Sequence, residues 1–168
     1  VRTLYASIYR PVWRLRAAVA RSPLFRYWQE LEDTQWLSQV ELERLQLARL
    51  QRLLHHAYQH VPFYRRRFED AGLHPDDVHS LADLGRLPVL TRDDVRQHLA
   101  ELVARDVPRQ GLLLNATGGS TGQPVSFYQD QTYQTYNVAA KLRYRRWYGF
   151  QRGDKVAFLW GMDRDLPH

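Results

Sequence analysis

The pattern of apolar residues changes near Pro108, and this change constrains the fold of the chain more than any other feature. Residues 38–60 repeat apolar side chains every three or four positions, which is typical of an amphipathic helix. After Pro108 the apolar residues stand in short runs of strand length, at 112–114, 125–128 and 155–160. The sequence therefore predicts an α/β fold, in which a helical segment is followed by strand, loop, strand, helix and strand.

The long helix predicted over 38–60 has clear start and stop signals. Ser38 and Glu41 form an S-x-x-E capping box, and Pro62 prevents the helix from continuing. The apolar positions of this helix predict one buried stripe: Leu42, Leu45, Leu50, Leu53, Leu54, Ala57 and Val61. A short helix over 63–71 is expected next, and Gly72 is expected to end it.

Two later helices are expected from their capping residues. Thr91 is a good N-cap, and the helix that it starts is predicted to run to about Leu102. Asp130 caps a second predicted helix over 131–148, which Gly149 closes. Because three short strands without further partners leave exposed sheet edges, we expect the predicted sheet to be incomplete.

The composition excludes several classes of protein. The 168 residues are 44% hydrophobic and 12% aromatic, which is enough for a packed core and excludes a disordered chain. The chain has no cysteine, so disulfide scaffolds, thiolate zinc sites and cysteine nucleophiles are excluded. The lack of cysteine fits a reducing compartment, and we expect a cytoplasmic location.

The positive charge is concentrated at the N-terminus. The net charge is +6, and residues 1–30 carry +5 of it, with six arginines and one glutamate. Arginines alternate there with apolar and aromatic residues, which predicts an amphipathic helix packed on its own domain. An alternative is a peripheral contact with a membrane surface or a docking partner, since the apolar runs are too short to span a bilayer. The rest of the chain is nearly neutral, so nucleic-acid binding is not expected.

The segment between the first two predicted strands has the composition of an anion-binding loop. It reads T-G-G-S-T-G-Q-P from Thr117 to Pro124. Its glycines allow close approach of the backbone to a ligand, and successive N–H groups can form a nest for phosphate oxygens. No lysine follows the last glycine, so the loop is not a Walker A motif. From spacing alone, a flexible hairpin loop remains the alternative.

Other clusters of polar residues have simpler interpretations. His56 and His60 lie four positions apart on the predicted helix, as metal-binding pairs do, but no third ligand is evident and no metal site is expected. The paired acids at 76–77 and 93–94 fit the first turns of helices, where the helix dipole favours negative charge. No catalytic residue is predicted.

The loop and its surroundings resemble a known family. T-G-G-S-T-G-Q-P is similar to the phosphate loop of adenylate-forming enzymes, and the flanking sequence resembles the phenylacetate–coenzyme A ligase-like proteins, including the CapK capsular-polysaccharide group. Three blocks carry the resemblance in the family's order: H-A-Y and V-P-F-Y-R between residues 56 and 73, L-P-V-L-T and D-V-R between 81 and 96, and the loop with W-Y-G-F, G-D-K and L-W-G up to residue 161.

This resemblance implies a fold and a chemistry. The chain would be the N-terminal part of such a ligase, with 1–37 a basic arm, 38–108 a helical segment, and 109–168 the start of the AMP-binding domain. The family activates a carboxylate with ATP and Mg²⁺ to an acyl-adenylate and transfers the acyl group to coenzyme A or another acceptor, and the CapK branch implies polysaccharide biosynthesis. ATP phosphates would be bound by Thr117, Gly118, Gly119, Ser120, Thr121 and Gly122.

The chain also departs from the family's pattern. Many relatives carry a lysine beside the loop, where this chain has Gln123 and Val125. The family's aromatic adenine-binding segment, its Mg²⁺-binding glutamate, its ribose-binding aspartate and its C-terminal lysine have no counterpart in these 168 residues. We therefore expect that this chain alone does not adenylate a substrate.

Overall fold

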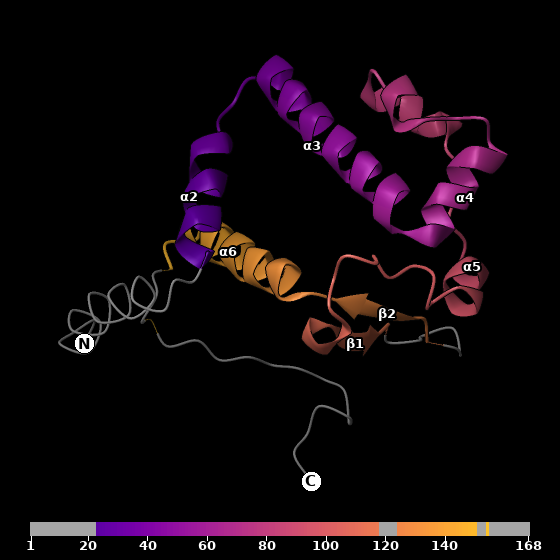
Figure 1. The fold of residues 1–168 in the computed structure, drawn as a ribbon. Helices are drawn as coiled ribbons and strands as arrows, with labels where there is room; N and C mark the ends of the chain where they lie inside the picture. The colour runs from indigo at the N-terminus through magenta and orange to yellow at the C-terminus, as the bar shows by residue number, and fades with distance from the viewer. Residues whose placement is uncertain (1–22, 118–123, 151–153, 155–168) are drawn as a thin grey trace, which may run out of the picture. The chain divides into compact units, whose positions relative to one another are not determined.

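A computed structural model describes residues 23–117, 124–150 and 154 of the chain (Figure 1). The chain divides into two compact units, one formed by residues 33–134 and the other by residues 1–32 together with 135–168. The third predicted strand, at 155–160, and most of the basic arm lie outside the described residues. The domain boundaries expected from the sequence remain a prediction.

Helix α3, Gln39–His60, begins at the predicted capping box. The Ser38 hydroxyl accepts a hydrogen bond from the Glu41 N–H, and the Glu41 carboxylate accepts one from the Ser38 N–H at 2.9 Å. Pro62 occupies the first turn of helix α4, Pro62–Asp70, so the chain changes direction at Val61. Gly72 follows α4 with φ +62°, a left-handed conformation that favours glycine. These predicted boundaries are confirmed.

The core of the 33–134 unit forms where α3 and α4 meet the short helices η1, Pro75–Asp77, and η2, Leu81–Arg86. Leu54, Phe68 and Val78 are buried together, and the Tyr58 ring meets Phe68 edge-on at 5.8 Å between ring centroids. Part of the predicted stripe of α3 is therefore buried. Leu53, however, is 62% exposed, so the prediction was wrong at that position.

Helix α5, Arg92–Gln97, is shorter than predicted. Thr91 caps it as expected, but the chain turns at His98 instead of continuing to Leu102. The turn is held by tertiary main-chain hydrogen bonds: the Glu101 carbonyl accepts from the Phe63 N–H at 3.3 Å. The Glu101 and Leu102 N–H groups donate to the His98 carbonyl at 2.9 and 3.0 Å, which closes the turn locally.

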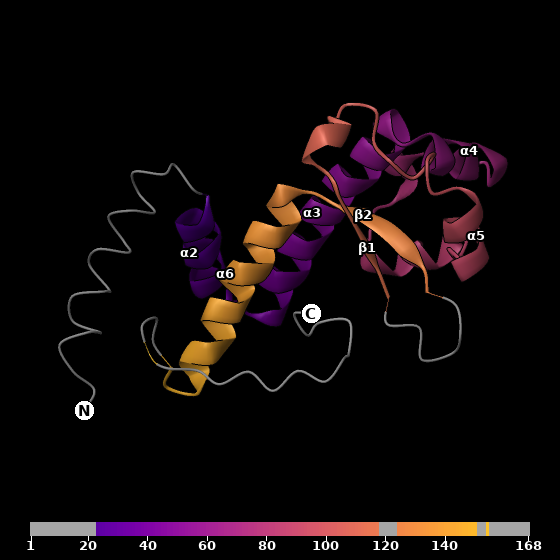
Figure 2. The ribbon, with the colours of Figure 1, turned by 90° about the horizontal axis from the view of Figure 1, so that it is seen from below.

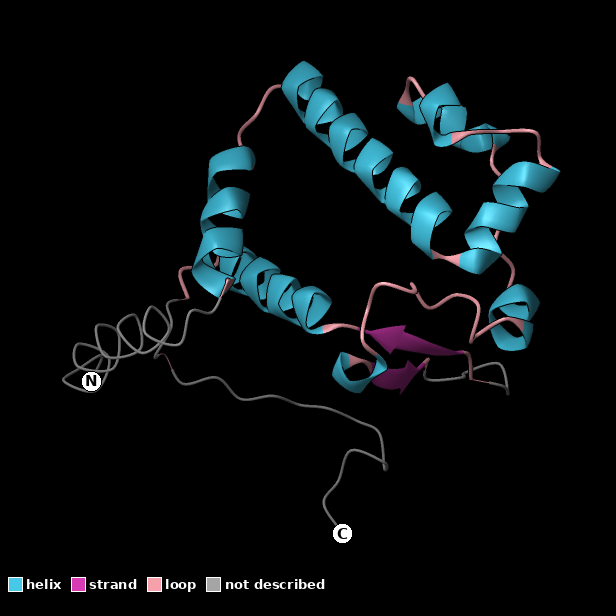
Figure 3. Cartoon of the chain, in the orientation of Figure 1, coloured by secondary structure: helices cyan, strands magenta, loops and turns pink. Residues whose placement is uncertain are grey.

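A short 3₁₀ turn, η3, Arg109–Gly111, comes before the sheet in the chain. The sheet is an antiparallel hairpin of two strands, β1, Leu113–Ala116, and β2, Ser126–Gln129 (Figure 3). Leu114 pairs with Tyr128, and Asn115 pairs with Phe127. Both strands begin one residue later than predicted. The described residues are thus mostly helical with one two-stranded sheet, as expected for an incomplete α/β domain.

The other unit contains most of helices α2, Leu24–Thr34, and α6, Gln131–Trp147, which lie side by side in Figures 1 and 2. The rings of Tyr27 and Tyr136 are 5.3 Å apart, and Arg146 forms an ion pair with Glu32 at 3.0 Å. Gly149 ends α6 with φ +77°. Among the described residues, none of the helices combines the length and the apolar character needed to cross a bilayer.

Candidate functional site

The neck of the glycine-rich loop is closed by Thr117 and Val125. The Thr117 N–H donates to the Val125 carbonyl at 3.0 Å, and the Val125 N–H donates to the Thr117 hydroxyl oxygen, also at 3.0 Å. These residues are the next pair in register after Ala116 and Ser126 at the end of the hairpin. The hairpin therefore fixes where the loop leaves and rejoins the sheet.

The Thr117 side chain takes over a main-chain role. In a regular antiparallel pair, the Val125 N–H would donate to the Thr117 carbonyl, but here it donates to the hydroxyl oxygen. A hydroxyl has one donor hydrogen and two acceptor lone pairs, so this bond leaves the hydroxyl hydrogen of Thr117 able to donate to an anion. The same side chain can hold the neck closed and contact a phosphate.

The remaining predicted phosphate contacts lie outside the described residues. Thr117 is the one predicted site residue that the structure describes, and it is exposed at the end of β1. The roles of the others therefore remain predictions: Gly118, Gly119, Ser120, Thr121 and Gly122.

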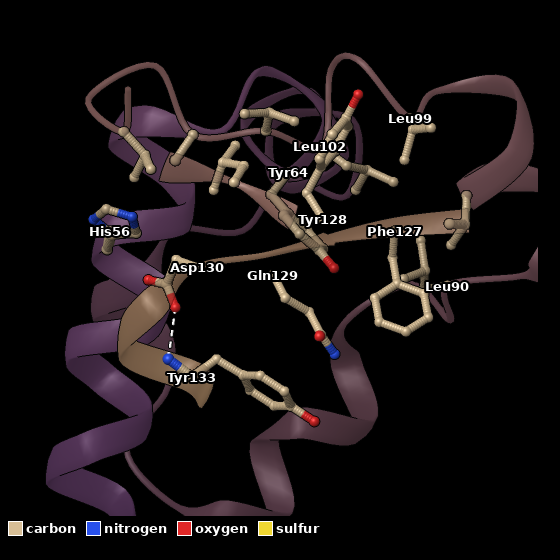
Figure 4. Close-up of a pocket in the computed structure, with 15 residues that line it drawn as sticks. His56, Tyr64, Leu90, Leu99, Leu102, Phe127, Tyr128, Gln129, Asp130 and Tyr133 are labelled. Atoms are coloured by element: carbon tan, nitrogen blue, oxygen red, sulfur yellow. Dashed lines mark hydrogen bonds between the residues drawn. The ribbon is translucent and has the colours of Figure 1, made fainter. Parts of the chain in front are cut away.

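A cavity of about 510 Å³ lies within the 33–134 unit, beside the hairpin (Figure 4). Its walls are mainly apolar and aromatic, with Tyr64, Leu102 and Phe127 among them, and His56 and Asp130 supply polar groups. The Asp130 carboxylate accepts a hydrogen bond from the Tyr133 N–H at 2.6 Å, so this group also caps α6 as predicted.

Sequence reasoning missed this cavity because its walls come from separate segments. Residues of α3, α4, the turn after α5 and β2 line it together, and no local motif marks them. The helix that starts at Thr91 was predicted to run to about Leu102, but Leu99 and Leu102 lie in the turn after α5 and line the cavity from there.

Hydrogen bonding and burial shift the pKa values of several ionisable groups in this unit. Burial raises the pKa of the Tyr64 phenol at the cavity wall, and the nearby positive charge of Arg67 opposes that shift. Tyr64 therefore remains a neutral hydrogen-bond donor near neutral pH. Hydrogen bonds from Arg66 and His98 lower the pKa of the Glu101 carboxyl, which keeps that group ionised.

The structure places a third polar group beside the histidine pair of α3. The Asp106 carboxylate lies 3.8 Å from the His56 Nδ1 and 3.9 Å from the His60 Nδ1. No third ligand was evident from the sequence because Asp106 is 46 residues beyond His60, in the turn that follows α5.

No protein-family model matches the chain. It is, however, 35% identical over 134 residues to the phenylacetate–coenzyme A ligase of Escherichia coli strain K12, an alignment covering 79% of this chain and 30% of that ligase. It is 25% identical over 113 residues to Protein CapK of Staphylococcus aureus, covering 67% of this chain and 24% of CapK.

Solved structures point to the same group. The crystal structure of 2-hydroxyisobutyryl-CoA ligase in the postadenylation state matches with a TM-score of 0.59 and 29% identity, covering 70% of this chain and 25% of that one. The matched region is thus less than a third of the length of these relatives. By its sequence and its fold, the chain belongs to the adenylate-forming superfamily, in the phenylacetate–coenzyme A ligase-like group that includes CapK.

Proposed function

We propose that this chain supplies the ATP phosphate-binding loop of a ligase that activates a carboxylate as an acyl-adenylate and passes the acyl group to coenzyme A. The observation that carries the proposal is the hairpin neck at Thr117 and Val125, which presents a loop of the family's sequence at the end of a two-stranded sheet. The similarity to phenylacetate– and 2-hydroxyisobutyryl-CoA ligases supports the acyl-CoA chemistry.

The loop would act by binding and orientation. Its backbone N–H groups and the hydroxyls of Thr117, Ser120 and Thr121 would hold the β- and γ-phosphates of ATP, which leaves the α-phosphate open to a carboxylate. Mg²⁺ would supply further charge neutralisation of the phosphates. Donors aimed at the leaving pyrophosphate would stabilise the charge that develops on it. No residue of the loop needs to transfer a proton.

The substrates belong to the same proposal. The two relatives named for their acids use small organic carboxylates, so we propose a small-molecule carboxylate here, with coenzyme A as the acceptor. A role in polysaccharide biosynthesis is a narrower proposal that rests on the similarity to CapK.

Because the family's adenine, ribose and Mg²⁺ motifs have no counterpart in the 168 residues, we expect the chain alone to bind ATP weakly, with a dissociation constant of about 1 mM. Equilibrium dialysis with labelled ATP tests this directly. Gly119→Asp is expected to weaken binding by at least about tenfold, because a carboxylate then faces the phosphates. Thr121→Ala is expected to weaken it less, since one donor is lost.

Thr132→Ala is the matched control, because this threonine lies on α6 outside the loop and is expected to leave binding unchanged. ATP binding that survives both loop substitutions would refute the assignment of the loop. The chain alone is also expected to show no ATP–pyrophosphate exchange, and measurable exchange would contradict that part of the proposal.

A further inference from the structure

We propose that His56, His60 and Asp106 form a binding site for one divalent transition-metal ion, with zinc as the preferred ion. This site is separate from the phosphate loop and does not depend on the ligase proposal. It joins the last turn of α3 to the turn that follows α5.

The two histidines lie on one face of α3, because residues four apart on a helix are neighbours. Their ring centroids are 4.9 Å apart, with an angle of 37° between the ring planes. The carboxylate of Asp106 faces both rings, with Oδ2 toward His56 and Oδ1 toward His60. Each residue offers one ligand atom, and these three atoms lie within 4.8 Å of one another.

The main chain holds Asp106 in this position. The N–H of the preceding residue, Arg105, donates to the His60 carbonyl at 2.9 Å, which ties the turn to the end of α3. The Val107 N–H donates to the Ala104 carbonyl at 3.3 Å, so the turn is closed around Asp106. The main chain is therefore held on both sides of Asp106, which keeps its side chain near the end of α3.

The separations suit an ion better than direct hydrogen bonds. At 3.8 and 3.9 Å, the two imidazole–carboxylate distances exceed a hydrogen bond. Two ligands on a tetrahedral zinc ion, each bound at about 2.0–2.1 Å, lie about 3.3 Å apart. The two imidazole–carboxylate separations would therefore have to shorten by about half an ångström for these groups to bind a common ion, and the three ligand atoms lie within 4.8 Å of one another.

A second histidine cluster in the same unit provides the contrast. The His55 Nε2 and the His74 Nδ1 lie 3.0 and 3.1 Å from the Asp76 carboxylate oxygens, and the His74 Nδ1 also accepts a hydrogen bond from the Asp76 N–H at 3.3 Å. The rings of that cluster are thus already in close contact with their carboxylate, whereas those beside Asp106 are not. The pair of clusters therefore gives a matched internal control.

The donor set indicates which metal would bind. Two imidazole nitrogens and one carboxylate suit zinc and its substitute cobalt(II), and three protein ligands leave a fourth position for water. The three side chains are 37–44% exposed, so an ion can reach them from solvent. The bound ion would link two segments that both line the cavity, through His56 on one side and Ala104 and Val107 on the other.

Titration of the untagged 168-residue chain with zinc chloride by calorimetry tests the proposal. We expect one equivalent of zinc to bind saturably, and cobalt(II) to give the visible absorption of a tetrahedral site. Asp106→Asn and His60→Gln are each expected to weaken zinc binding by at least about tenfold. His74→Gln, the control in the second cluster, is expected to leave the affinity unchanged.

A measurement on the unsubstituted chain makes the result independent of how the variants fold. Zinc is expected to shift the imidazole ¹⁵N resonances of His56 and His60, and not those of His55 and His74. The proposal is overturned if zinc does not bind saturably, if the His74→Gln chain loses binding while the Asp106→Asn chain keeps it, or if the resonances of the second cluster shift instead.

Discussion

Replacing Thr117 by valine tests how the neck of the loop is closed. Valine has the same branched shape as threonine and lacks only the hydroxyl, so the substitution removes the acceptor of the Val125 N–H and little else. The Thr117 N–H bond to the Val125 carbonyl does not involve the side chain, and we expect it to remain.

The size of the effect follows from the burial of Val125. This residue is only 9% exposed, so water has limited access to an N–H group left without an acceptor. Losing such a bond costs about 1–2 kcal/mol. The hairpin neck should therefore open about 5 to 30 times more often in the valine variant.

Amide hydrogen exchange followed by NMR measures this opening directly, without any nucleotide present. The Val125 amide is expected to exchange about 5 to 30 times faster in Thr117→Val, whereas the Leu54 amide in α3 should be unchanged. Thr117→Ser keeps the hydroxyl and should restore most of the protection. Equal exchange rates at Val125 in all three chains would show that the hydroxyl does not close the neck.

Three other substitutions and conditions have defined outcomes. Phe68→Ala should lower the free energy of unfolding by about 3–5 kcal/mol because Phe68 is buried in the core, and an unchanged urea midpoint would contradict that core assignment. Ser38→Ala should cost about 1 kcal/mol in thermal unfolding, since α3 loses its cap, while Ser38→Asp should cost little. Hydrogen bonds from the Thr91 N–H and hydroxyl lower the pKa of the Asp94 carboxyl in the folded chain, so its stabilising effect is present above about pH 4 and is lost as pH falls through the lowered pKa. The melting temperature, measured between pH 6 and 3, should therefore fall less with pH in Asp94→Asn than in the unsubstituted chain. Equal falls in the two chains would contradict this role of Asp94.

Local signals predicted the helix boundaries well. Ser38, Pro62, Gly72 and Asp130 each act through the backbone of their own turn, so their effects are encoded within a few residues. For the same reason, the two strands on either side of the loop were found close to their observed positions.

Features that depend on distant contacts could not be predicted. The turn after α5 is bonded to the start of α4 through Glu101 and Phe63, which lie 38 residues apart. Leu53 fits the apolar spacing of α3, yet none of the elements that the structure describes covers it. Asp106 reaches the histidine pair because the main chain of its turn bonds to the end of α3, and neither residue spacing nor composition indicates such a contact.

The central claim is that the hairpin loop binds the phosphates of ATP. The most direct measurement is a titration of the ¹⁵N-labelled 168-residue chain with MgATP, followed by the amide resonances of the chain. We predict that the Thr117 and Val125 amides at the neck, with those of the loop between them, shift together in a saturable way, and that Gly119→Asp abolishes these shifts. Shifts confined to other parts of the chain, or none up to several times the expected dissociation constant of about 1 mM, would contradict the account.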